Sequence, residues 1–139
     1  MSFLSSLNIS GSALTAQRYR MDLITQNLAN VDTTKTSDGG PYKRQLAVFT
    51  EQKLTFDKVL QNVGGGVKVT SVVESNAAFR TVYDPTNPEA DENGYVTYSN
   101  VDTTEEQVDL IAASNSYQAN LTALNVIKQM AMRGLEIGN

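Results

Sequence analysis

The residues best suited to chemistry gather between positions 83 and 96, where carboxylates and amides alternate with proline and glycine. Asp84, Asp91 and Glu92 carry oxygen donors of the kind that Ca²⁺ prefers. Their spacing does not follow the ligand order of an EF-hand, and no bidentate glutamate stands at the twelfth position. Two prolines and the Asn93-Gly94 dipeptide are typical of a fixed surface turn. We therefore expect a rigid loop here and no metal site.

The rest of the chain gives catalysis little support, because it contains no histidine and no cysteine. The commonest general base and metal ligand is absent, and so are thiolate catalysis, disulfides and cysteine-type zinc sites. Gly64, Gly65 and Gly66 lack the lysine and the serine or threonine that complete a phosphate-binding loop, so a hairpin bend is the simpler interpretation. We predict that the protein is not an enzyme, has no catalytic residues and needs no cofactor.

The charge balance limits the classes of partner. The chain has 11 Lys and Arg against 15 Asp and Glu, a formal net charge of -4, whereas nucleic-acid binding needs clustered positive charge. No stretch approaches the roughly 18 to 20 apolar residues that span a bilayer. The first residues lack the basic and apolar regions of a cleaved signal peptide. We expect no nucleic-acid partner, no membrane insertion and, if the protein leaves the cytoplasm, export without such a signal.

At both ends of the chain, the spacing of the apolar residues predicts a helix. These two helices would therefore carry any functional surface of the protein. Between residues 3 and 31, apolar residues recur at heptad spacing, although polar Ser10 and Gln17 interrupt the stripe. The stripe consists of Leu7, Leu14, Met21, Ile24 and Leu28. It is either an ordinary core-facing stripe or a seam between subunits. Asn27 and Asn30 suit the end of this helix, because asparagine tolerates left-handed backbone geometry and bonds neighbouring amides.

The last segment, residues 108–137, has the same periodicity. Thr103 and Glu106 form a capping-box pattern, and Asp109 favours the positive end of the helix dipole, so we expect the helix to begin near Thr104. One apolar stripe comprises Leu110, Ala113, Tyr117, Leu121, Leu124, Ile127, Ala131 and Leu135. A second stripe beside it comprises Ala112, Ala119, Ala123, Val126 and Met130. The apolar arc is therefore wider than one partner helix needs.

The middle of the chain alternates between polar and apolar residues and turns at glycine and proline. Four short strands are predicted, at residues 42–49, 67–73, 79–83 and 95–98. Residues 54–60 are ambiguous and compatible with a short helix. The predicted fold class is α+β, with long N- and C-terminal helices packed as an antiparallel coiled coil and a small antiparallel β unit inserted between them.

This pattern divides the chain into three parts: residues 1–34 and 103–139 are the helices of a helical core, and residues 35–102 are the small β domain with its loops. Burying one helical stripe offsets only part of the conformational entropy that is lost when about 30 backbone residues become ordered. A lone helical hairpin is therefore marginal. We hypothesise that the ends are weakly ordered in a free monomer and consolidate on assembly; circular dichroism showing full helix content in a proven monomer would count against this.

Several motifs, taken in order, resemble the flagellar basal-body rod protein family, in particular its FlgC-type proximal rod proteins. Asn27-Leu28-Ala29-Asn30, followed by Thr33, is similar to a motif shared across the rod and hook proteins of the flagellar axis. Its matching positions are Asn27, Ala29, Asn30 and Thr33. The other similar segments are residues 8–18, 39–44, 83–96, 108–120 and 135–138.

The resemblance spans nearly the whole chain, with few departures. The family usually has histidine where Asn87 stands, proline where Ser99 stands, glutamate where Gln118 stands and a charged residue where Asn115 stands. None of these is chemically essential to a structural subunit. They alter at most a local loop or a salt bridge between neighbours.

The resemblance implies a structural subunit of the proximal rod, located in the flagellar basal body in the cell envelope, that polymerises through its terminal helices to transmit motor torque. In this family those helices form a coiled coil that lines a tubular core. The implied partners are further copies, other flagellar rod proteins, the rod-to-membrane-ring adaptor and the flagellar type III export apparatus. The implied interface sets Leu7, Leu14, Met21, Ile24 and Leu28 against Tyr117, Leu121, Leu124, Ile127 and Leu135. Two alternatives are another axial subunit, of the rod or hook base, and a soluble binding module whose helical hairpin receives a ligand helix.

Overall fold

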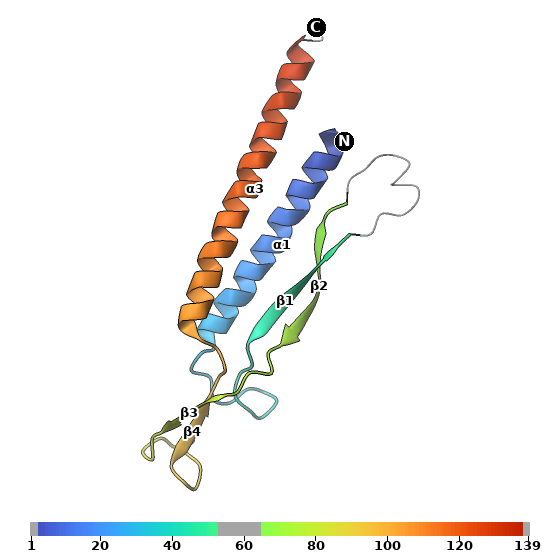
Figure 1. Cartoon of the computed structure of the whole chain (residues 1–139). Coiled ribbons are helices and arrows are strands. Elements are labelled where there is room, and N and C mark those ends of the chain that lie inside the picture. Colours follow the sequence, from blue (N-terminus) through green and yellow to red (C-terminus); the bar gives the residue numbers. More distant parts are fainter. Residues whose placement is uncertain (1–2, 53–64, 138–139) are drawn as a thin grey trace.

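The computed structural model describes residues 3–52 and 65–137, which form two long helices and four strands (Figure 1). The helices are α1 (Phe3–Ala29) and α3 (Thr103–Ile137). The strands are β1 (Gln45–Glu51), β2 (Val67–Glu74), β3 (Arg80–Tyr83) and β4 (Tyr95–Tyr98). The predicted α+β class is confirmed, and the ambiguous segment 54–60 lies outside the described residues.

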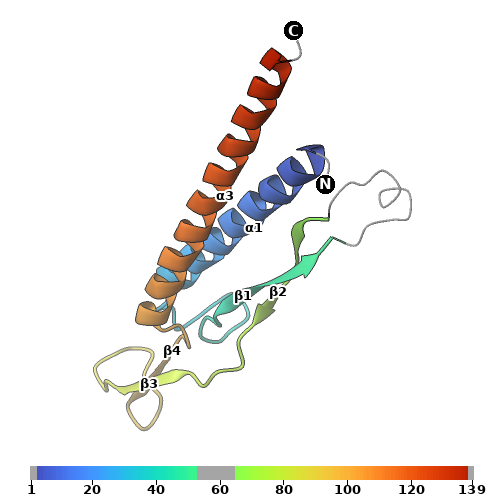
Figure 2. The ribbon, with the colours of Figure 1, turned by 45° about the horizontal axis from the view of Figure 1, so that its top comes forward.

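The two helices run antiparallel and lie side by side (Figures 1 and 2). α1 has 27 residues and α3 has 35, so α3 continues past the N-terminal end of α1. The heptad and 3.6-residue patterns therefore located both helices correctly, although α1 ends at Ala29, two residues before the end of the predicted pattern.

The start of α3 differs from the predicted capping box. The carboxylate of Asp102, one residue before Thr103, accepts hydrogen bonds from the backbone N–H of Thr104 at 2.8 Å and of Glu105 at 3.1 Å. The Glu105 and Thr104 bonds lower the pKa of Asp102, because they stabilise its charged form. Glu106 is not the second half of a capping box. Its side chain is 1% exposed and points into the molecule.

The four strands form two separate antiparallel pairs. β1 and β2 lie along α1, with a shift of register between Val48 and Phe49 that marks a bulge. β3 and β4 pair Tyr83 with Tyr95 and lie at the end of the molecule opposite the C-terminus of α3 (Figures 1 and 2). The molecule is thus elongated, with a helical end and a hairpin end.

Gly66 sets how closely the β1–β2 pair approaches α1. The hydroxyl of Ser12, on α1, accepts a hydrogen bond from the backbone N–H of Val67 at 3.0 Å. A Cβ on Gly66 would lie 2.5 Å from that hydroxyl oxygen and 3.1 Å from the Ser12 Cβ, so a side chain here would require either Ser12 or β2 to shift.

The buried core is small. Among the described residues, its apolar members are Ala16, Leu23, Ile24, Val96, Val101 and Ala113. Three lie on α1, one on the first turns of α3, and Val96 and Val101 lie on β4 and just before α3, while many larger apolar side chains remain at the surface. No helix in the described ranges is both long enough and apolar enough to cross a membrane.

Candidate assembly surface and the junction that positions it

The inner face of α3, which is the first apolar stripe of the sequence, is unevenly shielded, and it is most exposed at its C-terminal end. Ala113 is completely buried, and Tyr117, Leu124 and Ile127 are half-buried. Leu121 is 40% exposed. Leu135, two residues before the end of α3, is 73% exposed.

The predicted stripe of α1 is also only partly covered. Ile24 is buried, and the remaining members, Leu7, Leu14, Met21 and Leu28, are half-buried. A side chain in this state keeps apolar area that a further helix can cover. The structure brings Ile24 into the core of the single chain, and the other four residues stay available at the edge of the helix pair.

The outer face of α3 is bare. All five members of the second stripe, Ala112, Ala119, Ala123, Val126 and Met130, are exposed. Val108 and Ile111 extend the stripe toward the start of the helix and are 61% and 62% exposed. Scattered surface apolar residues are normal, but apolar residues that recur along one helix face, here interrupted by Asn115, are typical of a contact surface. We call this row, from Val108 to Met130, the outer α3 stripe.

Asn27 joins three elements near the base of the helix pair. Its amide nitrogen donates to the carbonyl oxygen of Gln45 at 2.9 Å and to Glu106 Oε2 at 3.0 Å. Its amide oxygen accepts from the N–H of Gln45 at 2.9 Å and from the hydroxyl of Tyr42 at 3.0 Å. The side chain is thus fully satisfied at 1% exposure, and it bonds both backbone groups of the first β1 residue as a neighbouring strand would.

Arg44 is the centre of an ion cluster beside Asn27. Its guanidinium donates to Glu106 at 2.5 Å, to Glu105 at 3.0 Å and to Asp109 at 3.3 Å. Arg20, on α1, adds a 2.9 Å pair with Asp109. We call this cluster and Asn27 together the junction, because it joins α1, the start of β1 and the first turns of α3.

Burial and charge shift two pKa values in the junction. Burial alone would lower the pKa of Arg44, but its hydrogen bonds and charge interactions with Glu106 and Glu105 raise it, so the guanidinium stays charged. Burial raises the pKa of the Tyr42 hydroxyl, and the negative charges of Glu106 and Glu74 add to this. Tyr42 therefore remains a neutral donor to Asn27 at physiological pH.

The other positions of the Asn-Leu-Ala-Asn motif lie at the end of α1. Asn30 suits the helix end as predicted, since its backbone N–H and its side-chain amide both bond the carbonyl of Gln26. Thr33 donates to the Asn30 side chain at 3.1 Å, and Ala29 is exposed. The prediction that Asn27 caps the helix is wrong, because its side chain makes the long-range bonds described above.

The loop between β3 and β4 is a fixed turn, as predicted. Asp84 Oδ1 accepts from Thr86, and Asp91 Oδ1 accepts from the N–H groups of Asn93 and Tyr95. Gly94 has a φ of 81°, which favours glycine. These carboxylates therefore organise the backbone of their own loop.

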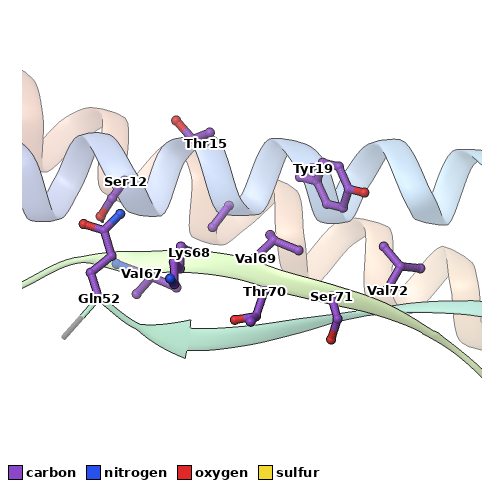
Figure 3. A pocket seen from close by; sticks show the side chains of 11 residues that line it. Ser12, Thr15, Tyr19, Gln52, Val67, Lys68, Val69, Thr70, Ser71 and Val72 are labelled. Carbon is purple, nitrogen blue, oxygen red and sulfur yellow. Dashed lines mark hydrogen bonds between the residues drawn. The ribbon is translucent and has the colours of Figure 1, made fainter.

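A groove of about 510 Å³ separates α1 from β2 (Figure 3). Its described lining includes Ser12, Thr15 and Tyr19 from α1 and Val67, Val69 and Val72 from β2. Figure 3 shows Val69 pointing from β2 toward α1. Valine and hydroxyl side chains dominate, so the groove offers packing and not acid–base chemistry.

Sequence reasoning missed the junction. The Asn27–Glu106 bond joins positions 79 apart, and the Arg44–Glu106 pair joins positions 62 apart. One signal was present, because Arg44 falls among the apolar residues of a predicted strand face, where a charge needs a partner. The structure starts β1 at Gln45, so Tyr42 and Arg44 precede the strand and lie beside the helices.

Comparison with known proteins gives matches at both ends of the chain and over its full length. The family model described as "Flagellar basal body rod FlgEFG protein C-terminal" matches residues 92–137, and that described as "Flagella basal body rod protein" matches residues 7–35. A protein of Bacillus subtilis (strain 168) named flagellar basal-body rod protein FlgC is 44% identical, with 99% of each chain covered. Proteins of the same name from Salmonella typhimurium and Borreliella burgdorferi are 44% and 40% identical, and they cover 99% of this chain and 99% and 98% of their own.

Proposed function

The chain belongs to the flagellar basal-body rod protein family, among its FlgC-type members, and from this we propose that it polymerises through the outer faces of its paired terminal helices and so transmits motor torque. It is a structural subunit of the bacterial flagellar basal-body rod. Its place is the basal body in the cell envelope, where it assembles with other rod components. Another rod or hook-basal subunit is not favoured, because the full-length relatives carry the FlgC name.

The outer α3 stripe is the observation that carries the polymerisation proposal. Val108, Ile111, Val126 and Met130 are 48% to 68% exposed on one chain. Covering the remaining apolar area of these four side chains contributes roughly 4 to 6 kcal/mol per copy. Association alone costs at least about 4 kcal/mol in lost translational and rotational freedom. A dimer of two isolated copies is therefore weakly bound, whereas a subunit that contacts several neighbours in a polymer is bound stably.

The predicted interface residues extend this surface around the helix pair. Leu7, Leu14, Met21 and Leu28 of α1, with Tyr117, Leu121, Leu124, Ile127 and Leu135 of α3, form its second part, and Ile24 supports them from the core. The half-buried members are suited to close the α1–α3 pair and to meet a neighbouring helix at its edges.

The junction supports the mechanical part of the proposal. A rod that carries torque needs the hairpins and the helices to rotate as one body. Arg44 contacts three carboxylates and Asn27 contacts two elements besides its own helix, so a twist applied to β1 is resisted by bonds to both α1 and α3. We further propose the rod-to-membrane-ring adaptor and the flagellar type III export apparatus as partners, no catalytic activity, and no cofactor.

Val126→Asp tests the function, in a strain whose own copy of the gene is deleted. Val126 is 48% exposed, so the substitution leaves the single chain folded and places a charge in the contact. Asn125→Asp is the matched control, because it adds the same charge one residue away on an exposed position off the stripe. We expect no rods by electron microscopy and no motility with Val126→Asp, and normal rods with Asn125→Asp. Motile cells with Val126→Asp at normal expression would contradict the proposal.

Leu124→Asp is the complementary variant. Leu124 is half-buried on the inner face, so the change weakens the helix pair itself as well as assembly. We expect loss of motility with intact expression. A purified Leu124→Asp chain should melt at a lower temperature than the Val126→Asp chain, and equal melting temperatures would show that the two faces of α3 do not differ as described.

A further inference from the structure

The two ends of this elongated molecule carry different surfaces. At the hairpin end, Tyr83 and Tyr95 are 63% and 44% exposed and contact each other edge to face, with ring centroids 5.2 Å apart. On the opposite face of the same strand pair, Val96 is 1% exposed and packs toward the body. The tyrosine face therefore points away from the protein and has no partner within the described chain.

The loop beside the tyrosines is held rigid by its own bonds. The N–H of Asp84 bonds the carbonyl of Gly94, and the N–H of Asp91 bonds the carbonyl of Tyr95, each at 2.9 Å. Glu89 is tied to Thr34 on a separate loop. A loop that is already ordered loses little entropy when it binds, and exposed tyrosines are frequent anchors of interfaces. We call Tyr83, Tyr95 and the loop between them the tip.

The helical end is apolar and differs in charge from the tip. Met130, Met132 and Leu135, in the last turns of α3, are 68%, 53% and 73% exposed. From residue 110 to residue 136 the chain has two basic residues, Lys128 and Arg133, and one acidic residue, Glu136. We call residues 128–136, in the last turns of α3, the overhang.

The tip has the opposite charge. From residue 81 to residue 101 the chain has four acidic residues and no lysine or arginine. The four are Asp84, Glu89, Asp91 and Glu92. Each end therefore combines exposed apolar side chains with a net charge: two positive charges against one negative at the overhang, and four negative charges at the tip, so the two net charges are opposite in sign.

We propose that the tip of one copy docks on the overhang of a second copy. The tyrosines of the tip contact the exposed methionines and leucine of the overhang, and the acidic loop lies beside Lys128 and Arg133. This contact rests on the rod assembly proposed above and adds a second, end-to-end kind of contact to it. Tip and overhang lie at opposite ends of one chain (Figure 1), so a chain cannot satisfy the contact by itself. Because the two surfaces differ, the contact is heterologous and repeats from copy to copy into a ring or an open row.

The absence of native cysteine allows a direct test by disulfide trapping. Asn93→Cys places a thiol at the tip and Gly134→Cys places one in the overhang, and neither removes a residue of the proposed contact. A Cβ at Gly134 meets nothing within 4 Å, so that change is tolerated. Both variants are produced together in cells that lack the native copy, and basal bodies are isolated and oxidised.

We expect a disulfide-linked band at about twice 15.1 kDa when both variants are present, and only background when either is present alone. Lys68→Cys, on exposed β2, replaces Gly134→Cys as the mismatched control and should give no band with Asn93→Cys. Adding Glu92→Lys to the tip chain, or Arg133→Glu to the overhang chain, should lower the yield about threefold to fivefold. Combining both reversals should restore it.

The outcomes separate this proposal from the assembly function. Normal rods without the mixed band would overturn the tip–overhang contact and leave assembly through the outer α3 stripe intact. A band from either variant alone would also overturn it, because that requires like ends to meet. If the Val126→Asp strain is motile, the assembly proposal fails first, and the end-to-end contact fails with it.

Discussion

Asn27→Ala should be the most damaging single truncation in the junction. The Asn27 side chain makes four hydrogen bonds, at 2.9 to 3.0 Å, to Gln45, Glu106 and Tyr42. Each contributes about 1 kcal/mol net, and buried partners left unpaired add to the loss. Alanine recovers about 0.6 kcal/mol in helix propensity. We therefore expect the free energy of unfolding to fall by about 3 to 4 kcal/mol.

Asn30→Ala is the matched control, because it deletes the same amide three residues later. Asn30 is half-buried and its side chain bonds only its own helix end and Thr33. The expected loss is about 0.5 to 1 kcal/mol. Urea unfolding followed by circular dichroism measures both changes, and hydrogen exchange at the Gln45 amide reports the lost bond directly. If the two variants differ by less than about 1 kcal/mol, Asn27 does not join the three elements as described.

Asn27→Asp adds a test in which the sign of the pH effect matters. Aspartate keeps the shape of asparagine but cannot donate, and it brings a second carboxylate to the place where Asn27 Nδ2 now lies 3.0 Å from Glu106. Two carboxylates this close raise the pKa of one of them in the folded state. The stability of this variant relative to the native protein should therefore recover as the pH is lowered from 7 toward 5. A constant difference over that range would refute the reasoning.

Four further substitutions probe other positions. Gly66→Ala should lower stability by about 1 to 3 kcal/mol, because its Cβ would meet the Ser12 hydroxyl at 2.5 Å, whereas Gly134→Ala, with nothing within 4 Å, should be neutral or stabilising by thermal melting. Arg44→Lys should cost about 1 to 3 kcal/mol in urea unfolding, since one ammonium group cannot contact three carboxylates as the guanidinium does. Asp102 has a pKa below its ordinary 3.8, so its contribution is present above that pH and is lost as the pH falls through the lower folded value. Asp102→Ala should accordingly lower the melting temperature at pH 7 and flatten its decline in acid; an unchanged acid decline would contradict the capping role.

The helices and strands could be predicted because their signals are local. The heptad positions of α1, the two stripes of α3 and the alternation of β2 each lie within one stretch of chain. The two stripes also predicted correctly that α3 has more apolar surface than α1 covers, as the exposure of Val126 and Met130 shows. The division into residues 1–34, 35–102 and 103–139 stays a prediction.

The errors have a different physical origin. Thr103 and Asp102 are both good N-caps. Which of them caps the helix depends on whether the Glu106 side chain turns back to the start of the helix or points into the molecule. Glu106 turns inward because Arg44, 62 positions earlier in the chain, receives it. Asn27 was assigned to a local cap for the same reason, since its true partners are brought together only by the fold. Polar residues with a plausible local role are therefore the ones that sequence reasoning misplaced.

The unequal faces of α3 explain how one helix serves both the single chain and the rod. The inner face closes on α1 around buried Ala113, while the outer stripe is left for neighbours. The junction fixes the base of this pair, so the outer stripe is presented by a stiff support. In the assembly proposed above, neighbouring copies would cover this outer stripe, which is exposed in the single chain.

The most direct test of this account is thiol labelling of two single-cysteine variants, free in solution and in isolated basal bodies. Val126→Cys places the thiol on the outer α3 stripe, and Ala113→Cys places it on the inner face, where the native side chain is 0% exposed. We expect the thiol at position 126 to react readily in the free protein and to be protected in the assembled rod. The thiol at position 113 should be protected in both. Equal reactivity of the position 126 thiol in free and assembled protein would contradict the claim that neighbours cover this face.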